Sequence, residues 1–160
     1  MAVREFVRIA QPSVWRICAA LGSPGHEEDL TQETFVRAFR SLATYRGESP
    51  VLPWLLTIAR RVCADHVRGR QRQRRLMGAL IHSSSTDMSS RWAADHDHAI
   101  WSVLDGIHPD RLEAFMLTQV AGLSYDEAAD MLGCPIGTVR SRVARARADL
   151  VIAVRAAEAS

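Results

Sequence analysis

The chain has 160 residues, enough for one domain or for two small ones of about 70 residues each. Its formal net charge is only +2, yet residues 60–75 carry seven Arg against one Asp, residues 140–147 carry four Arg, and residues 27–33 carry four acids and no base. This segregation favours a polyanion partner and a separate protein partner. No apolar run is long enough to span a membrane, which excludes a membrane-spanning protein. Cys18, Cys63 and Cys134 form no CxxC pair, which excludes a disulfide framework. The sequence therefore predicts a soluble, cytoplasmic protein.

Helical periodicity dominates the chain, and no run of alternating β-branched residues indicates a strand, so the sequence predicts an all-α fold. We expect a first helical stretch over residues 3–21, interrupted or restarted at Pro12, and a second helix over 26–42. A loop at 44–53 precedes a third helix from Trp54 to about residue 70. The side chains expected in the core of this half are Phe6, Ile9, Val14, Trp15, Cys18, Leu21, Leu30, Thr34, Phe35, Ala38, Phe39, Leu42, Trp54, Leu55, Ile58, Ala59, Val62 and Val67.

A serine-rich segment of low hydrophobic periodicity then divides the chain. We predict two small helical domains, 1–76 and 96–160, joined by a flexible linker at 77–95, and we expect residues 83–90 of this linker to be disordered in the free protein. In the second domain, helices near 97–107 and 109–121 lead into a helix-turn-helix.

The helix-turn-helix is predicted from the residues that begin and end its helices within 122–150. Ser124 followed three residues later by Glu127 is a capping box, which opens a helix at the next residue. Gly133 ends that helix, and Pro135 fits the first turn of the next one because its missing N–H leaves no bond unmade there.

The last helix has one apolar stripe, formed at steps of three and four by Ile136, Val139, Val143, Ala146 and Leu150. Its opposite face carries Thr138, Ser141 and Arg145, with Arg140 and Arg142 on the two flanks. Short hydroxyls and a central Arg suit base edges in a major groove, and flanking Arg side chains suit phosphates. An ordinary helix pair with a solvated basic face would give the same pattern.

Three ordered motifs together resemble the extracytoplasmic-function (ECF) group of bacterial RNA polymerase sigma factors over almost the full length. They are EEDLTQETFVRAFRSL at 27–42, YRGESPVLPWLLTIARRVCADHVR at 45–68, and GLSYDEAADMLGCPIGTVRSRVARAR at 122–147. The resemblance implies sigma regions 2 and 4 and a protein that binds the β′ and β subunits of core polymerase. It implies transcription from −10 and −35 promoter elements, with no covalent chemistry and no cofactor.

The resemblance also implies roles for particular residues. The core-polymerase contacts fall on Asp29, Gln32, Glu33 and Arg37. The −10 contacts fall on Tyr45, Arg46, Trp54, Arg60, Arg61, Arg68 and Arg70, and the −35 contacts on Thr138, Arg140, Ser141, Arg142 and Arg145. The chain departs from the family at Leu56, Arg61 and the segment 51–53, so no base preference at −10 is carried over.

Two other classes of function remain open on the sequence alone. A dimeric helix-turn-helix regulator would use the first domain as an effector or dimerisation module. An enzyme is disfavoured because the six His are scattered. His96 and His98, with the neighbouring Asp95 and Asp97, could hold a metal weakly, but such alternating side chains are more often merely solvated, and no metal site is predicted. An anti-sigma factor, which most of this family has, is a possible further partner.

Overall fold

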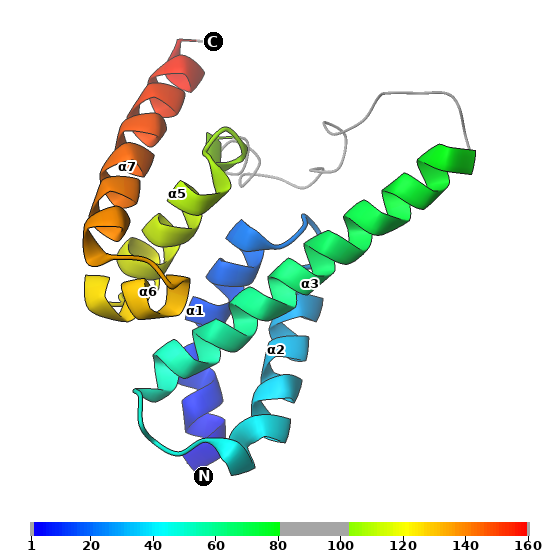
Figure 1. Cartoon of the computed structure of the whole chain (residues 1–160), viewed down its shortest axis with the longest axis vertical. Helices are drawn as coiled ribbons and strands as arrows, with labels where there is room; N and C mark the ends of the chain where they lie inside the picture. Colours follow the sequence, from blue (N-terminus) through cyan, green and yellow to red (C-terminus); the bar gives the residue numbers. More distant parts are fainter. Residues whose placement is uncertain (1, 81–102, 160) are drawn as a thin grey trace.

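The computed structural model describes residues 2–80 and 103–159, which are helical throughout apart from short connections and contain no strand (Figure 1). The first domain comprises α1 (Ala2–Leu21), α2 (Glu27–Ser41), the 3₁₀ turn η1 (Leu42–Thr44) and α3 (Val51–Leu80). The second comprises α5 (Pro109–Phe115), the π-helical turn η2 (Met116–Val120), α6 (Tyr125–Leu132) and α7 (Ile136–Glu158). The all-α, two-domain prediction is therefore confirmed. The predicted linker beyond residue 80 and most of the helix near 97–107 lie outside the described residues.

Helix α1 differs from its prediction in two respects. It runs unbroken through Pro12, which lies on the exposed side of the helix. Packing of the opposite face outweighs the hydrogen bond that proline cannot make. Ile9, predicted to face inward, is 63% exposed, whereas Ala10 and Ile17 are buried. The buried face of α1 therefore includes small apolar residues as well as large ones. The prediction used mainly the large residues, and so it placed the buried face at the wrong angle around the helix.

The end of α2 and the start of α3 also depart from expectation. Phe39 and Leu42 were predicted to be in the core but are 44% and 47% exposed, because α2 ends at Ser41 and these side chains line an open apolar groove of about 200 Å³. Helix α3 begins three residues before Trp54, whose amide donates to Pro50 O at 3.4 Å. Pro53 is tolerated because the first turn of a helix leaves its amides unbonded. The helix continues ten residues past its predicted end and through the first four positions assigned to the linker.

The helix-turn-helix forms as the capping residues predicted. Ser124 Oγ accepts a hydrogen bond from the Glu127 amide at 3.1 Å, and Glu127 Oε2 accepts one from the Ser124 amide at 2.8 Å. Gly133 ends α6 at φ +63°, a left-handed conformation that favours glycine. Pro135 is the N-cap of α7, so this helix starts one residue later than predicted.

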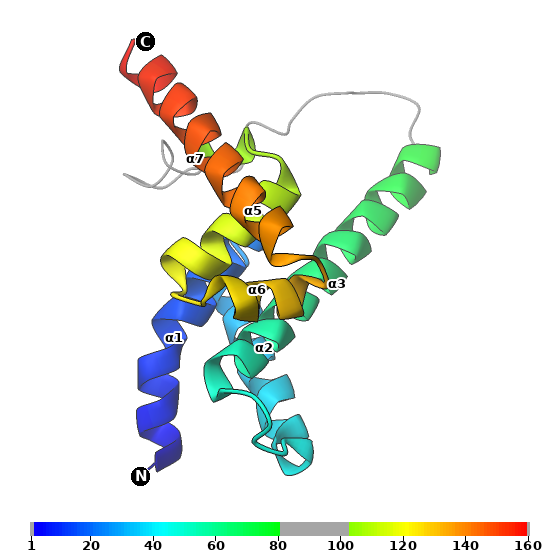
Figure 2. The ribbon, with the colours of Figure 1, turned by 60° about the vertical axis from the view of Figure 1, so that its left-hand side comes forward.

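The two domains pack against one another. Helix α5 and the turn η2 lie against α1, and α6 lies against α3 (Figures 1 and 2). Buried apolar side chains from both domains form one continuous cluster, which includes the free thiols of Cys18 and Cys63. In this structure, therefore, residues of the first domain that face the second are covered by it.

Gly22, between α1 and α2, is a position where a side chain has no room. A Cβ there would lie 2.3 Å from Leu30 Cδ1 and 2.5 Å from the backbone oxygen of Cys18. Gly22→Ala is expected to lower the free energy of unfolding by at least about 1 kcal/mol, because the backbone must shift. At Gly69, in α3, a Cβ would meet nothing within 4 Å, so Gly69→Ala should stabilise by about 0.5–1 kcal/mol. Urea denaturation of both variants tests these two predictions. Equal changes in the free energy of unfolding of the two variants would contradict them.

Candidate nucleic-acid interface

The outer face of α7 presents the side chains predicted to read DNA. Ser141, Arg140 and Arg145 are exposed, and Thr138 is half-buried. Val139 and Val143, on the opposite side, are fully buried against the rest of the second domain. Ser141 Oγ donates to Thr138 O at 3.0 Å, which leaves the hydroxyl oxygen available as an acceptor.

The two flanks of this face are not equivalent. The Arg142 guanidinium lies 3.3 Å from Asp110 on α5 and has a side chain only 27% exposed. Arg140, on the other flank, is exposed. To contact a phosphate, Arg142 must therefore break its ion pair with Asp110 or bind both groups at once. The periodicity of α7 does not indicate this difference between the two flanks.

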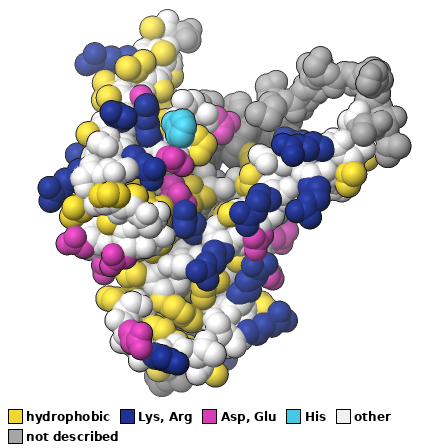
Figure 3. Space-filling view, viewed as in Figure 1, with side chains coloured by type: hydrophobic (Ala, Val, Ile, Leu, Met, Phe, Trp, Pro, Cys, Tyr) yellow, Lys and Arg dark blue, Asp and Glu magenta, His cyan; other side chains and the backbone are white. Residues whose placement is uncertain are grey.

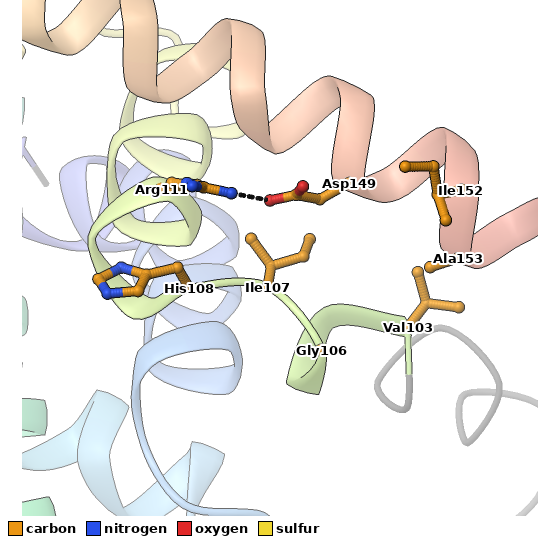
Figure 4. A pocket seen from close by; sticks show the side chains of 8 residues that line it. All are labelled: Val103, Gly106, Ile107, His108, Arg111, Asp149, Ile152 and Ala153. Atoms are coloured by element: carbon orange, nitrogen blue, oxygen red, sulfur yellow. Dashed lines mark hydrogen bonds and ion pairs between the residues drawn. The ribbon is translucent and has the colours of Figure 1, made fainter.

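An ion pair joins α5 to the second half of α7 and holds the direction of this helix. Arg111 Nη1 lies 2.8 Å from Asp149 Oδ2, and the two side chains close one wall of a pocket of about 540 Å³ between α5 and the second half of α7 (Figure 4). None of the predicted −35 residues lines this pocket. A further bond, from Arg147 Nη2 to Gln119 Oε1 at 2.5 Å, ties the helix to η2.

In the first domain, α3 carries most of the predicted −10 arginines, but they point in different directions. Arg61 and Arg68 are exposed, and Arg68 also contacts Asp65 at 2.6 Å. Arg70 is half-buried, with Nη1 2.9 Å from His26 Nε2 at the start of α2. The structure thus brings Arg61 and Arg68 to one surface and turns Arg70 away from it.

Tyr45 and Trp54 come together at the base of the loop between α2 and α3. Their ring centroids are 4.9 Å apart, and the Tyr45 hydroxyl donates to Ser49 O at 2.5 Å, which closes the loop. Trp54 is half-buried and also lines the apolar groove beside Phe39. Trp54 is therefore partly a packing residue and partly an accessible aromatic surface, and Arg46 is exposed in the same loop.

Arg60 is held by the second domain. Its Nε donates to Glu113 Oε1 on α5, and its Nη1 donates to Met131 O near the end of α6 at 3.3 Å. The Arg60 and Glu113 side chains are only 33% and 17% exposed. With the domains packed in this way, Arg60 is not available to a phosphate.

The predicted polymerase face on α2 divides into two parts. Asp29 and Gln32 are exposed. Glu33 pairs with Arg37 at 2.7 Å, and Arg37 reaches Asp65 on α3 at 2.9 Å. The hydrogen bonds from Arg37 and Arg68 hold the pKa of Asp65 below its usual range. Glu33 and Arg37 therefore fasten α2 to α3 as well as presenting charge to solvent.

A contact between two histidines beside this face was not predicted from the sequence, because no local pattern indicates it. The rings of His26 and His66 lie 4.7 Å apart between α2 and α3. Burial, together with the neighbouring His26 and Arg70, holds the pKa of His66 below its usual range. Three acids that bond to predicted site residues were also missed: Asp65 bonds to Arg37 of the predicted polymerase face, and Asp110 and Glu113 bond to the predicted DNA-binding residues Arg142 and Arg60. These partners lie 28, 32 and 53 residues away in the sequence, so no local pattern indicates the pairs.

These features define a class of protein: a two-domain, all-α DNA-binding protein with a helix-turn-helix and an arginine-rich helix beside an acidic one. The sequence matches the family models for Sigma-70 region 2 over residues 6–73 and Sigma-70 region 4 over residues 97–150. It is 44% identical over 148 residues to the ECF RNA polymerase sigma factor SigC of Mycobacterium tuberculosis, covering 91% of this chain and 80% of that protein. The chain belongs to the ECF family of RNA polymerase sigma factors.

Solved structures agree with this assignment. A sigma factor RpoE in complex with the anti-sigma factor NepR from Bartonella quintana matches with a TM-score of 0.79 and 28% identity, covering 96% of this chain and 97% of that one. CnrH, in complex with the cytosolic domain of CnrY, matches with a TM-score of 0.69 and 27% identity, covering 95% and 86%. The protein is thus a transcription initiation factor rather than an enzyme. Within the described ranges, no helix is long and apolar enough to cross a membrane, and no three His, Cys, Asp or Glu side chains could together hold a metal ion.

Proposed function

We propose that this sigma factor contacts core RNA polymerase through the exposed part of α2 and reads the −35 element with α7, and that it acts in the cytoplasm. The observation that carries the proposal is the rotation of α7: buried Val139 and Val143 leave Ser141 and Arg145 at the centre of the exposed face. This geometry suits a recognition helix in a major groove.

For the −10 element, the proposed contacts are the loop aromatics and the exposed arginines of α3. A base taken out of the stack needs an aromatic surface and hydrogen-bond donors, because unstacking costs a few kcal/mol. Tyr45 and Trp54 offer the surface, Arg46 the donors, and Arg61 and Arg68 the phosphate contacts. An anti-sigma factor is included among the partners because both related structures above contain such a complex or a second protein bound to the sigma factor.

Run-off transcription tests this assignment. Purified chain and core polymerase, supplied with a genomic promoter library, should give discrete products that depend on both proteins. Stable binding of the chain alone to an operator, with no specific transcript from the mixture, would instead identify a dimeric regulator.

The contact between Arg60 and Glu113 should oppose promoter binding. Glu113→Gln removes the charge that holds Arg60, so the free chain should open, with a larger radius of gyration in X-ray scattering and up to about fivefold tighter binding to core polymerase, equivalent to about 1 kcal/mol. Arg60→Gln breaks the same pair and should open the chain equally. It also removes an arginine that the family resemblance assigns to the −10 element and that the opened chain would free, so its holoenzyme should bind promoter DNA more weakly than that of Glu113→Gln. Identical promoter affinities would remove Arg60 from the −10 site.

A further inference from the structure

Two free thiols lie together in the core, beneath the place where the two domains meet. Cys18 of α1 and Cys63 of α3 are 0% and 1% exposed and belong to the same apolar cluster. Their side chains are hydrogen-bonded to one another. Two thiols in contact can form a disulfide with little movement of the backbone, whereas distant ones cannot. None of the contacts with polymerase or DNA uses either thiol.

The hydrogen bonds around the pair determine which thiol donates. The Thr34 hydroxyl donates to Leu30 O at 2.7 Å, so its proton is already used. The Cys18 thiol, 4.0 Å from Thr34 Oγ1, is therefore the donor in that weaker contact, and Cys63 donates to the Cys18 sulfur. The bond from Cys63 lowers the pKa of Cys18, although burial opposes it, and the same bond raises the pKa of Cys63. Cys18 is thus the thiol that ionises more readily, and the thiolate is the reactive form.

A pocket between the domains leads to this pair. Cys63 forms part of the wall of a cavity of about 260 Å³, which Arg60 and Arg68 of α3 and Asp110 and Glu113 of α5 also line. Figure 3 shows acidic and basic side chains together where the second domain meets α3. A molecule as small as hydrogen peroxide therefore has a polar route toward the thiols at the domain boundary, and separation of the domains would widen it.

We propose that Cys18 and Cys63 are an oxidation site, at which a peroxide forms a reversible disulfide between α1 and α3, and that this disulfide loosens the packing of the second domain. The Cys18 thiolate attacks one peroxide oxygen and the O–O bond breaks. This step leaves a sulfenic acid, and the second oxygen departs as water with the proton lost from Cys18. The Cys63 sulfur then attacks the sulfenic sulfur, and the hydroxyl group departs as a second water with the Cys63 proton. The two thiols together lose two electrons to the peroxide.

The disulfide changes the surface on which the second domain rests. A covalent bond holds two sulfurs closer together than the contact between two thiols does, so forming it draws α1 toward α3. The second domain contacts both helices, with α5 and η2 on α1 and α6 on α3. Because protein interiors are close-packed, a shift of α1 against α3 makes the second domain fit less well. The packed arrangement of the domains therefore suits the reduced chain.

Peptide mapping of the full chain tests the oxidation site. The reduced chain is treated with hydrogen peroxide, its remaining free thiols are alkylated, and trypsin places Cys18 and Cys63 in separate peptides, 17–37 and 62–68. Monomeric chain should yield these two peptides linked to one another, dithiothreitol should separate them, and Cys134 should be alkylated. Absence of the link, a link to Cys134, or a link that forms only in urea would overturn the site.

X-ray scattering tests the effect on domain packing. Oxidised chain should have a larger radius of gyration than reduced chain. Dithiothreitol should restore the smaller value, which separates the disulfide from methionine oxidation, because methionine sulfoxide is reversed by its own reductases. Cys134→Ala, in the turn between α6 and α7, should respond to peroxide as the wild type does, and Cys63→Ala should not respond. A radius that oxidation leaves unchanged, or an equal increase in Cys63→Ala, would overturn the link between the disulfide and domain packing. The wild-type peptide map and the wild-type reversal by dithiothreitol do not depend on either variant.

Discussion

Replacing Asp29 and Gln32 of α2 by Arg is expected to weaken binding to core polymerase by at least about thirtyfold, or about 2 kcal/mol. Both side chains are exposed. A close ion pair between Asp29 and a basic partner surface is worth this much when it is desolvated, and an Arg in place of the neutral Gln32 would be repelled by the same surface. Glu33 is avoided because its reversal would put two cations together at Arg37 and would disturb the packing of α2 on α3. A binding titration with labelled core polymerase measures the effect.

The control reverses a distant acid. Glu158→Arg changes an exposed carboxylate at the end of α7 and should leave core affinity within about twofold of the wild type. Circular dichroism should show all three proteins equally helical. Unchanged affinity of the α2 variant would place the polymerase contact elsewhere.

Replacing Arg145 by Ala should cost about 1–3 kcal/mol on the preferred −35 sequence, a loss of roughly 5- to 150-fold, and should relax discrimination at that position. Arg145 is exposed at the centre of the face opposite Val139 and Val143. Arg140→Ala should weaken all promoters similarly and reduce the salt slope by about 0.9. Arg140 is the better edge variant because Arg142 is also bonded to Asp110.

Transcription by holoenzyme from a set of −35 variants, repeated over a salt series, separates these effects. The opposite pattern, in which Arg145→Ala lowers every promoter equally and Arg140→Ala alters sequence preference, would mean that DNA approaches α7 from its Arg140 side. The rotation of the helix itself is fixed by its buried valines and by the Arg111–Asp149 pair.

The second domain was predicted well because its signals are local. A capping box, a left-handed glycine and a regular apolar stripe each act within a few residues, so Ser124, Gly133 and Val143 could be placed from the sequence. The ends of α3 were not predicted correctly. Pro53 and Gly69 are residue types that often end a helix, and yet both are compatible with this one. The pairing of Arg60 with Glu113 was out of reach, since it depends on how two domains dock.

The exposure of Phe39 is a second case in which the sequence pattern does not determine the packing. Its position in the 3.6-residue period matches that of its buried neighbour Phe35, but the bundle ends beside it. The periodicity of a helix indicates the direction in which a side chain points. It does not indicate whether another helix lies close enough to cover that side chain. The α2 arginine that bonds to Asp65 is a comparable case, because a charged pattern does not reveal which charges are already paired.

Because α3 is unbroken, the direction of each side chain along it depends on its residue number in the helix. Asp65 is bonded to Arg37 of α2, and Arg72 and Arg75 follow less than three turns later with no hinge between them. The angular position of these two arginines relative to α2 is thus set by the number of residues that separate them from Asp65. Adding a single residue between Asp65 and Arg72 would turn both arginines by about 100° around the helix axis and advance them by about 1.5 Å. Most substitutions on the exposed sides of the same segment would leave their direction unchanged. For the direction of these side chains, the number of residues in this segment matters more than the identity of its exposed residues.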